Sequence, residues 1–243
     1  MCTLAWGEAE AGFLICFNRD EQRSRPLAED PRLHPADPVP LIYACDPQGG
    51  GTWFAASTRG FAVALLNNYP GSAMDPSDSY RSRGELVLKV ASMAAQEAAV
   101  WLEEEDFSSY APFFLFILDP EAVLGIEWDG KQMHRINPSN DFWTTSSHQP
   151  EAITAWRRQW WNEQFHAAGG TPLDMAGLMR RTHPGKPSHG LTMDRPDART
   201  LSQIELLIST GTIRFTYRAR EPEGQGYREP VEITHHREPP YAE

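Results

Sequence analysis

The chain has 243 residues, which is enough for one large domain or two small ones. Acidic residues outnumber basic residues, 33 against 22, and the net charge of −11 would repel a phosphate backbone, so we expect no nucleic-acid partner. No apolar run approaches the roughly 20 residues that span a bilayer, and the N-terminus has no basic segment leading into an apolar one; we therefore expect no membrane span and a cytoplasmic protein.

Cysteine and histidine usage bears on cofactors. The three cysteines, Cys2, Cys16 and Cys45, cannot form a complete set of disulfides, and free thiols suit a reducing compartment. No CxxC pair occurs, and the histidines lack the spacing of metal ligands. We therefore expect neither a metal nor a cofactor.

The hydrophobic pattern predicts strands and helices in alternating groups along the chain. Extended segments are expected at residues 2–6, 12–17, 41–44, 52–57, 61–66, 113–118, 123–128, 132–136, 142–145, 190–193, 200–208 and 212–217. Helices are expected at residues 82–105, as one or two helices, and at residues 151–166 and 173–181.

Two of these strands, 61–66 and 113–118, have almost no polar face, which is typical of strands buried on both sides. Two mainly antiparallel sheets between helical layers would satisfy this burial, which predicts an α+β fold with a four-layer αββα sandwich. We expect one domain over residues 1–219. The segment 220–243 is rich in Glu, Pro and Gly and is expected to be a poorly packed tail.

The most informative residue is Cys2, directly after Met1. If Met1 is removed, one residue carries both a thiol and a free α-amine, which together make a nucleophile and its base. The alternative is that Cys2 is the first residue of a buried strand, since free cysteine packs as a small hydrophobe. The tetrapeptide Asn18-Arg19-Asp20-Glu21 offers a cation and a carboxylate that could tune these groups, although such a run is also common in a solvated turn.

Several motifs occur in order along the first half of the chain: Cys2, Asn18 to Glu21, Gly50-Gly51-Thr52-Trp53, Ser57 to Gly60, Asn67-Asn68-Tyr69 and Ser82 to Val87. With these motifs the chain resembles the NRDE family, the family of transport and Golgi organisation protein 2. That family in turn resembles cysteine N-terminal-nucleophile hydrolases such as penicillin V acylase and conjugated bile acid hydrolase. The resemblance implies an αββα fold and cleavage of non-peptide amides.

The resemblance also implies roles for particular residues. Cys2 would be the nucleophile, with Arg19 and Asp20 beside it; because adjacent strand residues point to opposite faces, both reach Cys2 only if the chain turns there. Asn68 would be an oxyanion donor or, alternatively, a residue of a strand-ending turn.

Substrate binding is assigned to four further residues. Asn18 and Asn67 belong to the motifs, Ser147 offers a hydroxyl where the hydrolases carry an asparagine, and Arg157 would bind a carboxylate. The alternative for Arg157 is a surface salt bridge.

Two functions follow. The first is an amidohydrolase that cleaves the C–N bond of a small acylated substrate through Cys2. The second is a non-catalytic carrier of a haem-like or lipidic ligand, or a trafficking-related interaction protein on the same fold. The partner is a small-molecule substrate or ligand in both main hypotheses, with its specificity set by the loops 25–40 and 69–80; the sequence makes no prediction of oligomeric state.

Overall fold

The computed structural model consists of two antiparallel sheets packed face to face and covered by helices. It describes residues 1–35, 38–69, 80–138, 141–167, 169–222, 224 and 226–237. In these ranges no helix is long and apolar enough to cross a lipid bilayer.

The first sheet has the strand order β10-β1-β2-β11-β12-β13, and every neighbouring pair is antiparallel. Its strands are β1 (Cys2–Ala9), β2 (Gly12–Gln22), β10 (Phe142–Thr144), β11 (Ala198–Ile208), β12 (Thr212–Ala219) and β13 (Val231–His236). A two-residue connection between Ala9 and Gly12 joins β1 to β2, and this hairpin sets Cys2 opposite Arg19.

The second sheet runs β3-β4-β5-β6-β7-β8-β9 and is also antiparallel. Its strands are β3 (Arg32–His34), β4 (Leu41–Tyr43), β5 (Phe54–Ser57), β6 (Phe61–Asn67), β7 (Phe113–Leu118), β8 (Val123–Trp128) and β9 (Met133–Ile136). The central strands β6 and β7 are apolar on both faces because one face meets the first sheet and the other meets helices.

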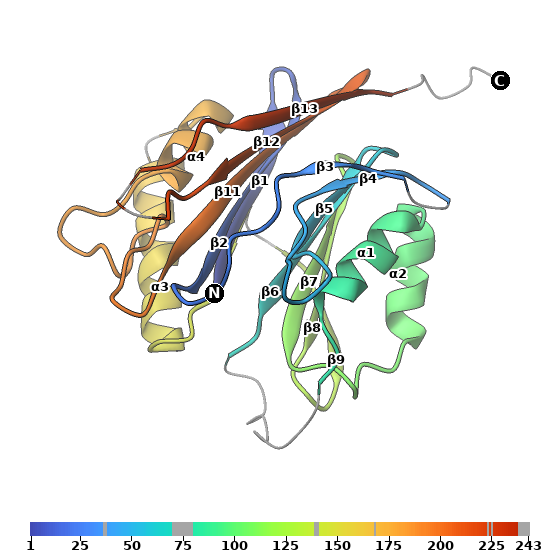
Figure 1. Ribbon diagram of the computed structural model, residues 1–243, viewed down its shortest axis with the longest axis horizontal. Helices are drawn as coiled ribbons and strands as arrows, with labels where there is room; N and C mark the ends of the chain where they lie inside the picture. The colour runs from blue at the N-terminus through green and yellow to red at the C-terminus, as the bar shows by residue number, and fades with distance from the viewer. Residues whose placement is uncertain are drawn as a thin grey trace.

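Helices cover both outer faces, as Figure 1 shows. They are α1 (Gly84–Ser92), α2 (Ala95–Glu104), α3 (Pro150–Trp161), a π-helical turn η1 (Asn162–His166) and α4 (Pro172–Met179). The first two pack on the second sheet and the others on the first sheet. The predicted four-layer αββα sandwich is therefore confirmed.

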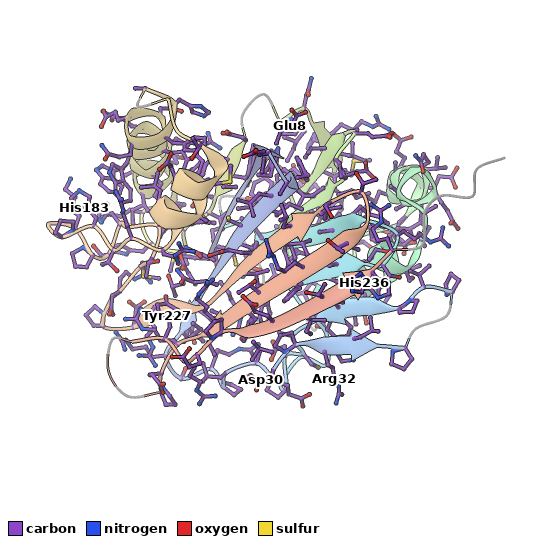
Figure 2. All side chains as sticks on the ribbon, turned by 90° about the horizontal axis from the view of Figure 1, so that it is seen from above. Glu8, Asp30, Arg32, His183, Tyr227 and His236 are labelled. Carbon is purple, nitrogen blue, oxygen red and sulfur yellow. The ribbon has the colours of Figure 1, made fainter. Side chains whose placement is uncertain are left out.

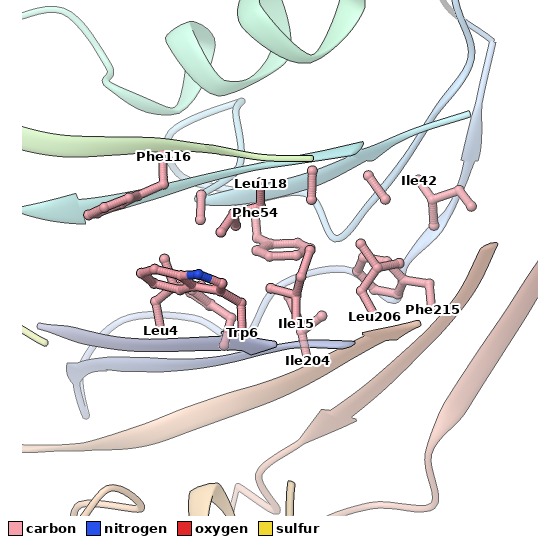
Figure 3. Packing of buried hydrophobic residues seen from close by; sticks show 14 of the residues in the cluster. Leu4, Trp6, Ile15, Ile42, Phe54, Phe116, Leu118, Ile204, Leu206 and Phe215 are labelled. Carbon is pink, nitrogen blue, oxygen red and sulfur yellow. The ribbon is translucent and has the colours of Figure 1, made fainter. Parts of the chain in front are cut away.

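The main core lies between the sheets, where alternate residues of each strand meet (Figure 3). Trp6 of β1 packs against Phe116 of β7 with ring centroids 5.9 Å apart, and Phe54 contacts both Phe17 and Phe215. Cys2 belongs to this same cluster at the start of β1. The cavity described below therefore borders the main core, because Cys2 belongs to both.

Several predictions of local structure were wrong. The segment expected to be a poorly packed tail contains β13, which pairs with β12 and ends at His236 (Figure 2). The strand predicted at residues 190–193 does not form; the nearest bridge joins Asp194, just beyond this segment, to Arg199. Strand β3 lies in the Pro-rich loop 25–40, and much of the second predicted specificity loop, residues 70–79, lies outside the described residues.

Candidate functional site

A cavity of about 340 Å³ lies beside Cys2, at one end of the interface between the sheets. Its walls come from β1, β2, the segment 46–53, the end of β6 and the start of α1. They consist of Met1, Cys2, Arg19, Asp20, Glu21, Arg25, Asp46, Gly49, Gly51, Thr52, Trp53, Leu65, Asn67, Tyr80, Arg81, Ser82, Arg83, Gly84 and Ala111.

Arg19 lies in this cavity with Cys2. It is 3% exposed, and its guanidinium carbon lies 3.9 Å from the centroid of the Trp53 ring. The Arg19 Nη2 atom is 3.7 Å from Glu21 Oε2 and 4.0 Å from Asp46 Oδ2. Glu21 is on the same side of β2 as Arg19 because residues two apart on a strand share a face.

The Asp20 carboxylate lies on the opposite side of the sheet from the thiol of Cys2. Its Oδ2 atom accepts a hydrogen bond from Arg157 Nη2 at 3.2 Å, and its Oδ1 atom accepts one from Thr200 Oγ1 at 2.6 Å. The chain does not turn at the tetrapeptide: β2 continues to Gln22, and the irregularity lies in the partner strand β11. The sequence left open which of Arg19 and Asp20 faces Cys2; the Arg19 side chain lies in the cavity with Cys2, and the Asp20 side chain does not.

Arg157 does not contact the cavity, contrary to its predicted role in substrate binding. Its side chain has no exposed surface, and besides the Asp20 carboxylate it donates to the hydroxyls of Thr3 and Thr144 at 3.0 Å and to the carbonyl of His189 at 3.0 Å. These contacts join α3 to β1, β2 and β10. Arg157 is a structural link across the first sheet and its helical cover.

Asn18 and Ser147 are also remote from the cavity. The Asn18 amide is buried and donates to the carbonyls of Met179 and Leu191, so it ties β2 to the end of α4. Ser147 is exposed. The hydroxyl nearest Cys2 in that segment belongs to Thr145, whose Oγ1 accepts from the Cys2 N–H at 3.3 Å while its own N–H donates to the Cys2 carbonyl at 3.0 Å.

Asn67, rather than Asn68, lines the cavity. The Asn68 N–H donates to the Pro112 carbonyl at 3.1 Å, and its side-chain amide donates to Glu127 Oε1 at 2.8 Å. The same amide nitrogen also donates to the Trp128 carbonyl at 3.5 Å, so the donors of Asn68 are committed to the second sheet, which removes the predicted oxyanion donor. Asn67 Nδ2 donates to the Tyr69 hydroxyl at 3.1 Å, and an amide NH₂ has a second N–H to offer.

Met1 occupies part of the site. Its α-amine donates to the Asp20 carbonyl at 3.0 Å and to the Tyr69 hydroxyl at 2.6 Å, and its side chain packs on Met193 and Ala198. Burial lowers the pKa of this amine, but the neighbouring Tyr69, Cys2 and Asp20 raise it more, so the net shift is upward.

Cys2 is only 7% exposed with Met1 in place. Burial raises its pKa to about 11, and Asp20 and Glu21 add to the rise while the terminal amine and Arg19 oppose it. At neutral pH the thiol is therefore protonated, and it needs a base to become a nucleophile.

Sequence reasoning assigned no role to several residues of the cavity. Trp53 and Arg83 both lie in motifs that support the family resemblance, so a signal for them existed. Asp46 and Arg25 form an ion pair of 2.5 Å within the wall, and no local pattern indicates that pairing.

Known structures share this architecture. Penicillin V acylase from Agrobacterium tumefaciens is similar with a TM-score of 0.54 and 13% identity, covering 90% of this chain and 83% of that one. An N-acylethanolamine-hydrolyzing acid amidase orthologue from Caenorhabditis elegans has a TM-score of 0.60 and 13% identity, covering 85% of this chain and 92% of that one.

A cysteine-to-alanine mutant of conjugated bile acid hydrolase from Clostridium perfringens has a TM-score of 0.55 and 11% identity, covering 96% of this chain and 92% of that one. At these identities the similarity establishes the fold alone. The fold is that of the N-terminal-nucleophile hydrolases.

The sequence model of the family described as Transport and Golgi organisation 2 matches residues 1–171. The protein therefore belongs to the Transport and Golgi organisation 2 family. No curated protein sequence matches the chain.

Proposed function

We propose that the protein is a cysteine N-terminal-nucleophile hydrolase that cleaves a non-peptide C–N amide bond in a small acylated substrate, with Cys2 as the nucleophile. The observation that carries the proposal is the position of Cys2 on the wall of a cavity, paired in register with the buried cation Arg19. The fold shared with structures of amide hydrolases supports it.

The proposal requires the removal of Met1. In the chain with Met1 present, the Cys2 nitrogen is part of a peptide bond and cannot act as a base, while the raised pKa of about 11 keeps the Cys2 thiol neutral. Removal frees the Cys2 amine as a base and empties the part of the wall that Met1 fills. Thr145 Oγ1, which already accepts from the Cys2 nitrogen at 3.3 Å, would orient that amine.

In the proposed reaction the Cys2 amine takes the proton from Cys2 Sγ, and the sulfur attacks the amide carbonyl carbon. The tetrahedral intermediate collapses as the C–N bond breaks and the leaving amine takes the proton from the Cys2 ammonium. A water then gives a proton to the amine and attacks the thioester carbonyl. The C–S bond breaks, Sγ regains its proton, and the carboxylic acid leaves.

We assign oxyanion stabilisation to Asn67. It lines the cavity, and only one of its two amide N–H donors is needed for the Tyr69 hydroxyl. Loss of one oxyanion donor costs about 2.7–4 kcal/mol of transition-state stabilisation. The variant Asn67→Ala should therefore lower kcat by about 100- to 1,000-fold.

The experiment that tests the proposal is intact-mass analysis of the protein with a panel of acyl p-nitroanilides. The matched control is Cys45→Ala, which removes another free thiol and leaves Cys2 intact. An acyl adduct is expected on the parent and on Cys45→Ala but not on Cys2→Ala. Retention of Met1 in protein from the native host, or equal acylation of Cys2→Ala, would refute the proposal.

A second function, ligand carriage without turnover, is favoured by one observation. Asn68 has both its N–H and its side-chain amide engaged within the second sheet, so the donor expected for an oxyanion is not available from that residue. A carrier on this fold would use the same cavity for a haem-like or lipidic ligand. Saturable binding of such a ligand by a chain that retains Met1, with no acyl adduct from any amide, would select this function.

A further inference from the structure

Among the residues that the structure describes, the cavity beside Cys2 contains one cation that no carboxylate neutralises. Asp46 is paired with Arg25 at 2.5 Å, and Arg81 is paired with Glu85 at 2.6 Å. Arg83, in contrast, forms no ion pair with any residue that the structure describes. Its one hydrogen bond runs from Nη1 to the Pro112 carbonyl at 2.8 Å, which leaves Nε and Nη2 available for a ligand.

Further donors of the cavity wall lack acceptors among the described residues. Across the described ranges the Arg19 guanidinium makes no hydrogen bond, because its nearest carboxylate oxygens are 3.7 and 4.0 Å away. The buried Nε1 atom of Trp53 likewise has no acceptor in the described part of the chain. In the same part of the chain the Nε atom of Arg25, another residue of the wall, is also buried without an acceptor. Buried donors without acceptors are rare and costly, so these two atoms, together with the unengaged guanidinium donors of Arg19 and Arg83, indicate a ligand rich in acceptor atoms.

Arg83 is held in place by the backbone. It directly precedes Gly84, whose carbonyl accepts from the Thr52 N–H at 3.4 Å. A Cβ atom on Gly51 would lie 2.5 Å from the Gly84 carbonyl carbon. The two backbone segments are therefore in contact at a point where neither residue has a side chain. The contact between the motifs that contain Gly51 and Gly84 thus holds the start of α1 against the cavity wall. It also positions the Arg83 guanidinium beside that wall.

The charge of Arg83 persists despite its burial. Burial lowers the pKa of its guanidinium, and the nearby Tyr69, Cys2 and Glu21, which favour the charged form, offset this decrease only in part. An arginine remains protonated in proteins at neutral pH. The planar guanidinium binds a carboxylate through two parallel hydrogen bonds, which suits an arginine with two unused donor atoms better than a single neutral acceptor does.

We propose that the cavity binds its ligand through a carboxylate group and that Arg83 is the residue that selects for this charge. The inference rests on the proposed function, because the ligand is then an acylated substrate that carries a carboxylate. The net charge of −11 gives an anion no long-range attraction to the protein, so this selection depends on the local contacts with Arg83, Arg19 and Trp53.

The test compares three amides: N-hexanoylglycine, with the carboxylate on the amine side; the ethylamide of adipic acid, with the carboxylate on the acyl side; and neutral N-hexanoylethanolamine. For Arg83→Gln we expect kcat/KM to fall about 10- to 100-fold for a carboxylate-bearing amide and to change less than about 3-fold for the neutral one. Arg83→Lys should restore part of the loss. The matched control is Arg214→Gln, which removes the same charge from an exposed position on β12 that does not line the cavity.

The comparison also assigns the side of the amide that carries the charge, because only the amide with its carboxylate near Arg83 should respond to the substitution. Since each variant is compared with itself on charged and neutral amides, a loss of folded protein does not imitate a loss of charge selection. Equal rates on all three amides in the parent, unchanged in Arg83→Gln, would overturn the inference and leave the hydrolase proposal standing.

Binding to Cys2→Ala, measured by titration calorimetry, separates the two proposals. If the parent cleaves no amide but Cys2→Ala binds N-hexanoylglycine or the adipic ethylamide, and Arg83→Gln in that background loses at least about 10-fold in affinity, charge selection holds without catalysis. If neither carboxylate binds and neither is cleaved, the inference fails. A loss in Arg214→Gln as large as in Arg83→Gln would also refute it.

Discussion

The buried ion pair between Asp20 and Arg157 allows a test of how much this pair contributes to the free energy of unfolding. Both side chains have no exposed surface, and Arg157 donates three further hydrogen bonds, which together with the ion pair join α3 to three strands. Removal of one partner of a buried pair typically costs about 3–5 kcal/mol, because the other charge remains in a poorly solvating site. The variant Arg157→Met should therefore lose about that much free energy of unfolding.

For a chain of this size, 1 kcal/mol corresponds to a shift in Tm of about 2–4 °C, so the expected loss is roughly 6–20 °C. Urea unfolding followed by tryptophan fluorescence gives the free energy directly. The double variant Asp20→Asn with Arg157→Met should recover a large part of the loss, because no buried charge is then left unpaired. The matched control is Arg158→Met on the same helix, which is exposed and stacks over Trp143 at 5.1 Å.

We expect Arg158→Met to change the stability by less than about 1 kcal/mol. If Arg157→Met cost no more than this control, the ion pair would not be a significant source of stability. If it instead weakened ligand binding while its unfolding curve stayed unchanged, Arg157 would be a binding residue, as its sequence context alone had predicted.

Two further predictions concern the cavity wall. Gly51→Ala should destabilise the protein by about 1–3 kcal/mol because the new Cβ atom would lie 2.5 Å from the backbone of Gly84, whereas Gly211→Ala, with nothing within 4 Å, should be near neutral in thermal unfolding. In protein that retains Met1, burial raises the pKa of the Cys2 thiol from 9.0 to about 11, so the neutral thiol stabilises the fold below pH 9 and that contribution is lost as the pH rises toward 11. Urea unfolding at several pH values should show this alkaline decline relative to Cys2→Ala; parallel pH profiles for the two proteins would contradict the assigned pKa.

The sequence was sufficient for the layers of the fold because the period of its apolar residues reports burial directly. The strand predicted at residues 61–66 is observed at Phe61–Asn67, and the one at 113–118 has the same bounds as β7. Strands β3 and β13, each at one edge of its sheet, were missed for the same physical reason. Strand β13 is buried on one face only and has polar residues between its apolar ones, so its pairing depends on β12 rather than on its own hydrophobicity.

The candidate site was predictable only in part. The short β1–β2 connection fixes the register that sets Cys2 opposite Arg19, and a hairpin prediction at that point would have selected Arg19 over Asp20 for the cavity. The partners of Asn68 and Arg157 could not be predicted, because they come from elements 59 and 137 residues away along the chain. Long-range side-chain pairing leaves no periodic signal in a single sequence.

The tetrapeptide Asn18-Arg19-Asp20-Glu21 has two separate functions because it is part of strand β2. Arg19 and Glu21 face the cavity, whereas Asn18 and Asp20 anchor the strand to α4 and α3 through buried hydrogen bonds. The second pair acts on the site through the backbone, since a strand that slips by one residue exchanges its two faces and would carry Arg19 out of the cavity. Four consecutive residues can thus all be needed for one site even though only two of their side chains face it.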